Sequence, residues 1–296
     1  MKLLYNSKFL GHSCNAGHPE SPERLKFFQS EEETRLINGE QYLELCHSRQ
    51  YISLVKEYCK KQLWLSQDTF TCADSFETAC YAVSAAVQAS ESNAFALVRP
   101  PGHHAGFAKG EGFCIFNNIA IAVKRLLQKG QRVFVFDFDL HHGNGTQEIL
   151  EKEPNAFYFS THQAGIYPGT GMDSGKNFTN IPLNAGCRDV EYVRLLEKKL
   201  SPALKAFKPD VVALSAGFDS YYKDFSAKGF LGSGKESELS KEDFTAKAQA
   251  SALGFSLTKR SFEKIKELVT PYNHFAVLEG GYNPESIREG VNVFLE

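Results

Sequence analysis

The chain has 296 residues, of which 42% are hydrophobic and 23% are charged, with 33 Lys and Arg residues against 35 Asp and Glu residues. These proportions are ordinary for a packed globular protein and exclude a wholly disordered or fibrous chain. The formal net charge of -2 gives no overall electrostatic reason to bind nucleic acid or an anionic membrane. Because no apolar run approaches the roughly 20 residues that span a bilayer, and residues 1–12 lack a signal-peptide core, we expect a cytoplasmic protein with no membrane partner.

Short apolar runs that are typical of buried parallel strands recur along the chain. They are residues 94–98, 133–136, 156–159, 211–214 and 275–278. Helical spacing is found between them at 117–129 and at 190–207, where Pro202 is a candidate break. This alternation predicts a single α/β domain over residues 1–296, with a central, mostly parallel sheet and helices on both faces.

Two further patterns bear on the organisation of the chain. Residues 228–241 are rich in Gly and charge but lie between an expected strand and a helix expected from about Ser240, so we interpret them as a surface loop and not as a domain linker. Seven cysteines at irregular spacings include no C-x-x-C pair. They are therefore predicted to be reduced thiols with packing roles.

Polar side chains follow the apolar runs, at the edge of a parallel sheet where ligands bind. In chain order they are His103, His104, Asp137, Asp139, His141, His142, Asp219 and Tyr282. A single Asp or His after a strand is usually a helix cap or a turn residue. Because several strands deliver such residues to one edge, we favour a functional site there.

Asp139, His141 and Asp219 have the chemistry of a metal site. Asp139 and His141 are two residues apart, so in an extended segment their side chains leave the same face and can hold one ion. Asp219, from another strand end, completes a set of two carboxylates and one imidazole. Such a set leaves one coordination position open, as in a catalytic Zn²⁺ centre, although Fe²⁺ or Co²⁺ also suits it.

A metal-bound water that attacks a carbonyl needs a general base and then a general acid. The tandem histidines His103 and His104 can supply both if their surroundings differ. Asp137 is a candidate to orient one imidazole and Asn144 the other. Tyr282, on a turn that two glycines open, is a candidate to donate its hydroxyl to the developing oxyanion.

Six strings run in order from Arg99 to Asn283: RPPGHHA, GFCIFNN, DFDLHHGNGTQ, YPGTG, SAGFD and LEGGYN. Together with HPESPERL near the N-terminus, they resemble the zinc-dependent histone deacetylase family, within the arginase/deacetylase fold. HHGNGTQ and LEGGYN are more similar to the class II enzymes and their bacterial relatives. The resemblance implies one catalytic zinc ion on Asp139, His141 and Asp219.

The resemblance also implies individual roles. It makes His103 and His104 the catalytic pair, with Asp137 behind His103, Asn144 behind His104, and Tyr282 on the acyl carbonyl. The substrate-binding residues that it implies are Gly112, Phe113, Tyr167 and Asp68, the last of which could equally cap a turn. It implies a structural monovalent cation, usually K⁺, beside Asp137, Asp139, His141, Ser160 and Thr161.

Two other positions carry weaker expectations. The resemblance places His142 close to the site without binding zinc. Arg24 in HPESPERL is similar to an arginine that lines an internal channel, although a salt bridge at a helix start explains it equally well.

The function implied by the resemblance is hydrolytic removal of acetyl or related acyl groups from lysine side chains of proteins or peptides. The alternative is an acetylpolyamine amidohydrolase, for which Glu236 and Glu238 in the loop 223–240 are candidate acidic gate residues. That loop is expected at the rim of the substrate tunnel. A non-catalytic acyl-lysine binding module is disfavoured because every expected catalytic residue is present. A binuclear manganese hydrolase would need further carboxylates.

Overall fold

The computed structural model describes residues 1–13, 17–224 and 254–296. Within these ranges one sheet has seven strands in the order β1-β2-β7-β6-β3-β4-β5, and every neighbouring pair is parallel. The strands are β1 (Lys2–Leu4), β2 (Ala94–Ala96), β3 (Val133–Asp137), β4 (Ala156–Gln163), β5 (Phe178–Leu183), β6 (Val211–Ala216) and β7 (Asn273–Leu278). The predicted α/β class and parallel sheet are confirmed.

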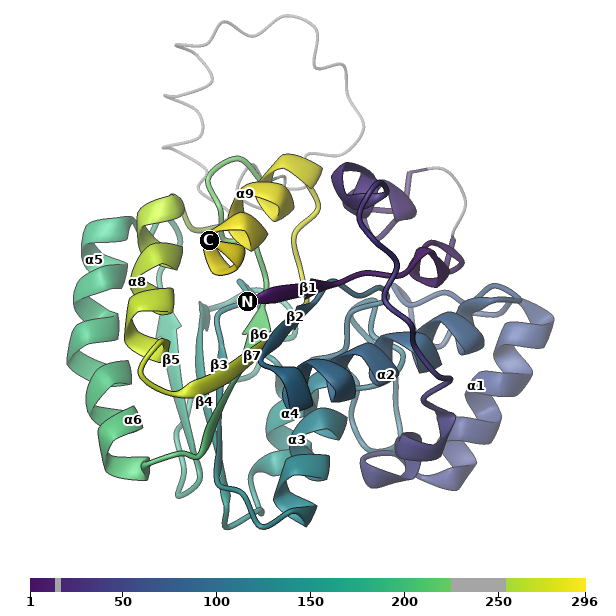
Figure 1. Ribbon diagram of the computed structural model, residues 1–296, viewed down its shortest axis with the longest axis horizontal. Coiled ribbons are helices and arrows are strands. Elements are labelled where there is room, and N and C mark those ends of the chain that lie inside the picture. Colours follow the sequence, from purple (N-terminus) through teal and green to yellow (C-terminus); the bar gives the residue numbers. More distant parts are fainter. Residues whose placement is uncertain (14–16, 225–253) are drawn as a thin grey trace, which may run out of the picture.

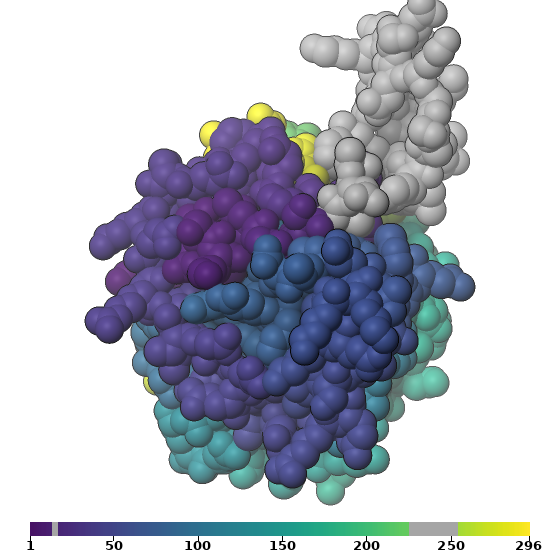
Figure 2. Space-filling view, turned by 90° about the vertical axis from the view of Figure 1, so that its right-hand side faces the viewer, coloured from purple at the N-terminus to yellow at the C-terminus, as the bar shows by residue number. Residues whose placement is uncertain are grey.

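Helices cover both faces of the sheet, as predicted (Figure 1). One side carries α1 (Arg49–Lys61), α2 (Ser75–Ser92) and α3 (Asn118–Gln128), and the other carries α5 (Asp189–Leu195), α6 (Ser201–Phe207) and α8 (Lys259–Val269). The other helices among the described residues are α4 (Asn144–Leu150), α9 (Pro284–Leu295), the 3-10 helices η1 (Ser7–Leu10), η2 (Pro22–Phe28) and η3 (Glu40–Leu45), and the π-helix η4 (Leu196–Leu200). Figure 2 shows that residues of the first third of the chain, in purple and blue, form much of the surface on the α1 and α2 side.

All five predicted strands are present, and the two further strands in the part of the chain that the structure describes are the edge strands β1 and β5. β1 has only three residues. β5 has the sequence FTNIPL, with a proline at position 182 and only partial burial, as is usual for an edge strand. Neither therefore carries the continuous apolar run by which the inner strands were found.

The stretch predicted as helical from 190 to 207 is helical throughout, and Pro202 does not break it. Residues Leu196–Leu200 form a π turn between α5 and α6, and Pro202 lies in the first turn of α6. Proline has no N–H to donate to the preceding turn, and the wider π hydrogen bonding falls directly before it. The helix therefore continues past Pro202, and the interruption of regular α-helix is confined to the π turn directly before it.

The centre of the sheet brings the site-bearing loops together. Every residue of β3 and β6 is buried, which explains their continuous hydrophobicity. β6 lies between β3 and β7, with Asp137 opposite Ser215 and Ala216 opposite Leu278. The loops that follow these three strands therefore begin side by side at one edge of the sheet.

Some sequence-based expectations concern residues outside the described ranges. These are most of the loops at 223–240 and 228–241, with Glu236 and Glu238, and the helix start near Ser240. The six cysteines within the described ranges are free thiols, as predicted. Among the helices that the structure describes, we find none with the length and apolar character to cross a membrane.

Candidate active site

Asp139, His141 and Asp219 converge beyond the carboxyl ends of β3 and β6. His141 Nδ1 lies 3.2 Å from Asp139 Oδ1 and 2.9 Å from Asp219 Oδ2. One ligand atom from each of the three lies within 4.8 Å of the others. The expectation of an extended segment, in which Asp139 and His141 leave the same face, is wrong. The chain bends at residues 139–141, and the His141 main-chain N–H donates to Asp139 Oδ1 at 2.9 Å. The bend achieves the expected convergence.

The two carboxylates of this group are buried and fixed by main-chain donors. Gly280 N–H donates to Asp139 Oδ2 at 2.8 Å, and Leu140 N–H donates to Asp219 Oδ1 at 2.9 Å. Each carboxylate thus keeps its other oxygen facing His141. A Cβ at Gly217 would lie 2.0 Å from Asp139 Oδ2, so this close approach requires glycine. Two fixed carboxylates and one imidazole fit a single Zn²⁺ with an open position.

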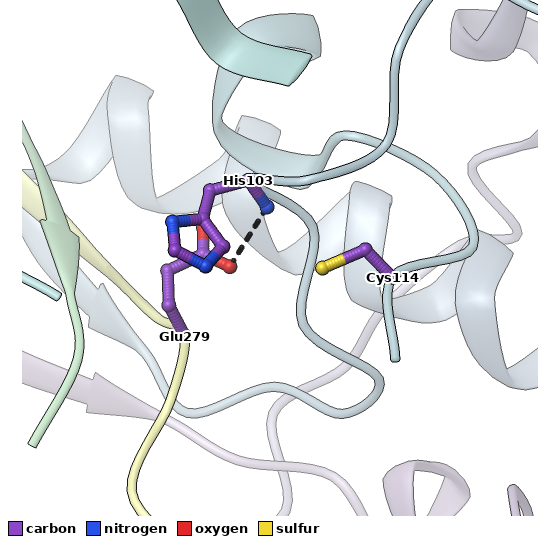
Figure 3. A group of neighbouring side chains, drawn as sticks. All are labelled: His103, Cys114 and Glu279. Atoms are coloured by element: carbon purple, nitrogen blue, oxygen red, sulfur yellow. Dashed lines mark hydrogen bonds between the residues drawn. The ribbon is translucent and has the colours of Figure 1, made fainter. Parts of the chain in front are cut away.

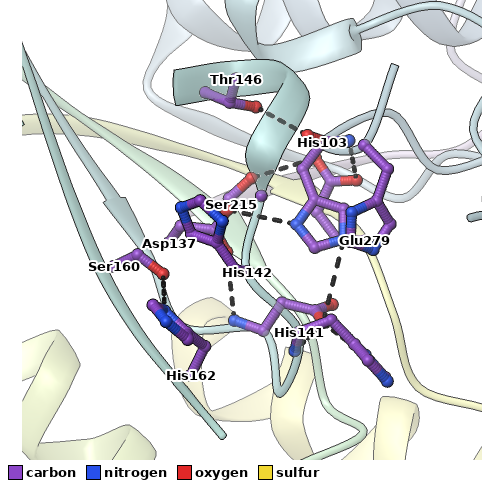
Figure 4. A network of polar contacts seen from close by, with 12 residues as sticks. His103, Asp137, His141, His142, Thr146, Ser160, His162, Ser215 and Glu279 are labelled. Carbon is purple, nitrogen blue, oxygen red and sulfur yellow. Dashed lines mark hydrogen bonds and ion pairs between the residues drawn. The ribbon is translucent and has the colours of Figure 1, made fainter. Parts of the chain in front are cut away.

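The tandem histidines lie against this group, each with the partner that the sequence suggested. His103 Nδ1 is 3.2 Å from Asp137 Oδ2, and His104 Nδ1 is 2.8 Å from Asn144 Oδ1. The two imidazole centroids are 4.0 Å apart, and both side chains are buried. Figure 4 shows His103 and Asp137 within the network of polar contacts behind the site. Asn144 is the first residue of α4.

The surroundings of the two histidines differ in charge. Burial alone would lower the pKa of His103, but the carboxylates of Asp139 and Asp137 outweigh it and raise the pKa to about 10. Burial lowers the pKa of His104 well below its usual range, and the neighbouring charges of His103 and His141 lower it further. The neighbouring carboxylates therefore favour the cationic form of His103, while burial and the adjacent imidazoles favour the neutral form of His104.

A cavity of about 250 Å³ opens onto these groups. Its lining residues are Asp68, His104, Gly112, Phe113, His141, Tyr167 and Tyr282. The four residues expected to bind substrate therefore share one cavity with Tyr282. The Tyr167 ring stands edge-on to His104 at 5.0 Å between centroids, and the Phe113 ring stands edge-on to Tyr282 at 5.7 Å.

The wall of this cavity depends on an unusual turn at Gly112 and Phe113, both of which have positive φ, at 57° and 68°. Asp68 Oδ1 accepts the Gly112 N–H at 3.1 Å as well as the hydroxyls of Ser66 and Thr69. Asp68 therefore does cap a turn, in addition to lining the cavity. A Cβ at Gly112 would lie 2.4 Å from His104 Cδ2, so a side chain there would displace the imidazole.

Glu279 is a buried residue of the site that sequence reasoning missed. Its Oε2 accepts the main-chain N–H groups of Gly102 at 2.7 Å and His103 at 3.0 Å, and Ser215 donates its hydroxyl to Oε1 at 3.1 Å. Figure 3 shows the bond to the His103 main chain. Burial raises the pKa of Glu279 to about 7. The only signal in the sequence was its place directly before the glycines of LEGGYN.

A second group of possible metal ligands, His103, Cys114 and Glu279, lies beside the first within the described residues (Figure 3). Its atoms already have hydrogen-bond partners, because the Cys114 thiol donates to Gly112 O at 3.3 Å and Glu279 accepts three bonds. Burial also raises the pKa of the Cys114 thiol well above its usual range. This group supports the loop of the tandem histidines and is a poor metal site.

Arg24 holds the turn that carries Tyr282. Its guanidinium is buried and donates to Gly281 O at 2.6 Å, to Glu279 O at 2.5 Å and to the Glu20 carboxylate at 3.0 Å. It also lies over the Tyr282 ring, 5.2 Å from the centroid. The expected salt bridge is thus present. It joins Arg24 in η2 to Glu20, which lies four residues earlier, before η2 begins.

The residues expected around a monovalent cation lie behind the metal donors. Asp137 and Ser160 are register partners on β3 and β4. The Ser160 hydroxyl pairs with His162 Nδ1 at 2.9 Å, and the Thr161 hydroxyl pairs with the Tyr192 hydroxyl at 2.7 Å. Each hydroxyl makes one hydrogen bond and keeps lone pairs on its oxygen, so hydroxyl, carboxylate and main-chain carbonyl oxygens are all present in this region for a cation.

Both ring nitrogens of His142 bond to residues outside the metal-donor group. Its Nδ1 lies 2.8 Å from Thr170 Oγ1 and its Nε2 lies 2.9 Å from Gln147 Oε1. Its ring faces that of His162, with 4.7 Å between the centroids. The position of this histidine agrees with the expectation of a residue close to the site that is not a metal ligand.

The parallel sheet, its order and the site beyond its central strands define the arginase/deacetylase fold. A crystal structure described as the HDA15 HD domain superimposes with a TM-score of 0.82 at 27% sequence identity, over 100% of this chain and 90% of that chain. A family model described as the histone deacetylase domain matches residues 18–296. The chain belongs to the histone deacetylase family.

Several curated relatives are similar over most of the chain. A probable deacetylase of Archaeoglobus fulgidus is 33% identical over 96% of this chain and 81% of its own length. Histone deacetylase 14, a chloroplastic protein of Arabidopsis thaliana, is 32% identical over 98% of this chain and 75% of its own length. The polyamine deacetylase HDAC10 of Rattus norvegicus is 36% identical over 66% of this chain and 37% of its own length. The family thus includes proteins named for different acetylated substrates.

Proposed function

We propose that this protein is a zinc-dependent hydrolase that removes acetyl or related acyl groups from lysine side chains. One observation carries the proposal: His141 of the metal-donor group, His104 of the tandem pair and Tyr282 all line the same cavity of about 250 Å³. A cavity of this volume with these groups at its wall suits an acylated alkyl amine whose carbonyl reaches the metal donors. Membership of the deacetylase family supports the same reaction.

The proposed mechanism assigns a distinct role to each residue. Zinc held by Asp139, His141 and Asp219 would activate water as a nucleophile and polarise the acyl carbonyl. His104 is neutral and lines the cavity, so it is the residue that accepts the proton from the attacking water and returns it to the leaving amine. Its Nε2 is on the side of the ring away from Asn144 and is the nitrogen left for this transfer.

The other groups stabilise charge. Asp137 pairs with His103 Nδ1 and favours its cationic form, so we assign His103 a positive charge next to the reacting centre rather than the role of a base. Tyr282 donates its hydroxyl to the oxyanion, and its ring is already held by Phe113. Gly112, Phe113 and Tyr167 wall the cavity around the alkyl chain of the substrate. A monovalent cation, K⁺, bound beside Asp137, Asp139, His141, Ser160 and Thr161, partly through main-chain carbonyls, would support the loop behind these groups.

The alternative substrate is a small acetylated polyamine. The rat relative is named as a polyamine deacetylase, and Asp68 contributes a carboxylate to the cavity wall. However, Asp68 belongs to the turn that shapes the cavity wall, where its Oδ1 accepts three hydrogen bonds, so its carboxylate has a structural role that needs no second cationic group of a substrate. We therefore favour acylated lysine peptides.

The test is an assay of zinc-loaded protein against acetyl-lysine peptides, longer acyl-lysine peptides and acetylated polyamines. We expect turnover of the peptides, its loss after removal of zinc by a chelator, and its return when zinc is added back. Turnover that survives chelation would contradict zinc dependence. A kcat/KM higher for acetylated polyamines than for every peptide would favour the alternative substrate.

A further inference from the structure

Glu111 lies directly behind the pair formed by His104 and Asn144. Asn144 Nδ2 donates to Glu111 Oε1 at 2.7 Å, while Asn144 Oδ1 faces His104 Nδ1 at 2.8 Å. Lys109 Nζ lies 2.6 Å from the same Glu111 oxygen and pairs with it. Glu111 also immediately precedes Gly112 of the cavity wall, although its own side chain is not among the residues that line the cavity.

From this chain of contacts we infer that Glu111 is a positioning residue that fixes the Asn144 amide and, through it, the tautomer of His104. An ionised carboxylate only accepts hydrogen bonds. The Asn144 amide must therefore turn its NH₂ group toward Glu111 and its oxygen toward His104. Because an amide oxygen is also only an acceptor, the hydrogen of the neutral imidazole must be on His104 Nδ1.

This arrangement decides which nitrogen of His104 can take a proton. With hydrogen on Nδ1, the lone pair is on Nε2, on the side of the ring away from Asn144. Without Glu111, the amide is free to rotate and present NH₂ to Nδ1, which favours hydrogen on Nε2 instead. A neutral imidazole in that second state cannot accept a proton at Nε2. The inference rests on the proposed role of His104 as the base.

The kinetic test replaces Glu111 with Leu, which has no acceptor, and with Gln, which retains one. We expect Glu111→Leu to lower kcat about tenfold, the scale of one charge-assisted hydrogen bond, with KM changed less than about twofold. The kcat of the Glu111→Gln variant should lie between that of Glu111→Leu and that of the unaltered chain. The matched control is Glu148→Leu, one turn along α4 from Asn144, where an exposed carboxylate accepts the Phe107 N–H at 3.3 Å. An equal fall in kcat for the control would overturn the inference.

A double variant at positions 111 and 144 distinguishes positioning of the Asn144 amide from general structural support of the loop by Glu111. Asn144→Asp in the otherwise unaltered chain places a second carboxylate against Glu111, and we expect kcat to fall more than for Glu111→Leu. Adding Glu111→Gln supplies an amide donor to the new carboxylate at position 144, which can then accept from that amide and from His104 Nδ1. We expect the double variant to exceed Asn144→Asp in kcat. If the decreases in kcat caused by Asn144→Asp and by Glu111→Gln simply add in the double variant, the inference is contradicted.

A spectroscopic measurement tests the tautomer without any activity. Long-range ¹H–¹⁵N spectra of the full chain, recorded with and without zinc, distinguish hydrogen on Nδ1 from hydrogen on Nε2, and His104→Phe assigns the signal. We expect the Nδ1–H form in the unaltered protein and a mixture in Glu111→Leu. An unchanged pattern in Glu111→Leu would overturn the inference. A protein with no deacylase activity but with this spectral change would instead refute the proposed function and leave the positioning role standing.

Discussion

The carboxylate of Glu279 accepts the main-chain N–H of His103 at 3.0 Å. Glu279 directly follows β7, and His103 lies in the long loop after β2, so one buried side chain ties two strand ends together. Its second oxygen accepts the hydroxyl of Ser215 on β6. The backbone that carries the tandem histidines is therefore fixed by a hydrogen-bonded carboxylate and not by packing alone, which is how a site is held ready before substrate binds.

Replacing Glu279 with Ala should destabilise the protein and misplace the tandem histidines. The change leaves the buried N–H groups of Gly102 and His103 without an acceptor, which costs about 2–4 kcal/mol in the free energy of unfolding. Urea unfolding measures this loss, and kcat of the folded variant should also fall. Glu279→Gln keeps one oxygen to accept these bonds and should lose less. A loss below about 1 kcal/mol for the Ala variant would show that these N–H groups find other partners.

Tyr282→Phe should lower kcat about 10²-fold or more while KM changes little, because it removes one donor to the oxyanion and keeps the ring. The ring itself is held by Phe113 and by the Arg24 guanidinium, so the variant should fold normally. Steady-state kinetics on an acetyl-lysine peptide measures the effect. An unaltered kcat would make this tyrosine a structural residue of the turn.

Asp219→Ala should abolish deacylation and sharply lower the zinc content of the purified protein. The change removes one of the three converging ligands and leaves His141 facing only Asp139. Metal analysis of purified protein gives the stoichiometry, expected near one ion in the unaltered chain. Asp173→Ala, which removes an exposed carboxylate outside the donor group, is the control and should retain zinc and activity. Two ions per unaltered chain would instead favour a binuclear site.

The inner part of the fold was predictable from the sequence, and the edges were not. Burial on both faces gives the strands at 133–136 and 211–214 a continuous apolar pattern that distinguishes them from their surroundings. Edge strands lack that cover, so the short β1 and the partly exposed β5 carry no such pattern. The convergence of the metal donors was predicted from an extended segment, but the chain bends at residues 139–141 and brings the donors together in that way.

The supporting residues of the site were harder to find than the residues that face the cavity. His104 and Tyr282 belong to distinctive strings, whereas Glu111 and Glu279 are single carboxylates whose roles depend on what lies opposite them in space. Glu111 meets Asn144 across 33 positions of sequence, and Glu279 meets His103 across 176. Spacing along the chain contains no information about such contacts, so only the three-dimensional arrangement identifies them.

His47 is a buried histidine whose hydrogen bonds define its protonation state. Its Nε2 accepts the Asn117 N–H at 2.9 Å, so in the neutral ring its Nδ1 carries the hydrogen and donates to Gly106 O at 2.9 Å. Burial lowers the pKa of His47 to about 4, from 6.5 in an exposed histidine. This residue therefore remains neutral in the folded chain at pH values where the unfolded chain binds a proton.

The stability of the protein should consequently fall as the pH is lowered from about 6.5 to about 4.5. In this range the unfolded state binds a proton at His47 and the folded state does not, so the free energy of unfolding decreases by about 1.4 kcal/mol per pH unit, or about 2–3 kcal/mol in all. Other buried histidines add to the slope, so the measurement compares the unaltered chain with His47→Gln, which keeps one donor and one acceptor but cannot titrate. Urea unfolding at several pH values should show a shallower dependence for His47→Gln. Parallel curves for the two proteins would mean that His47 is protonated without cost in the folded state.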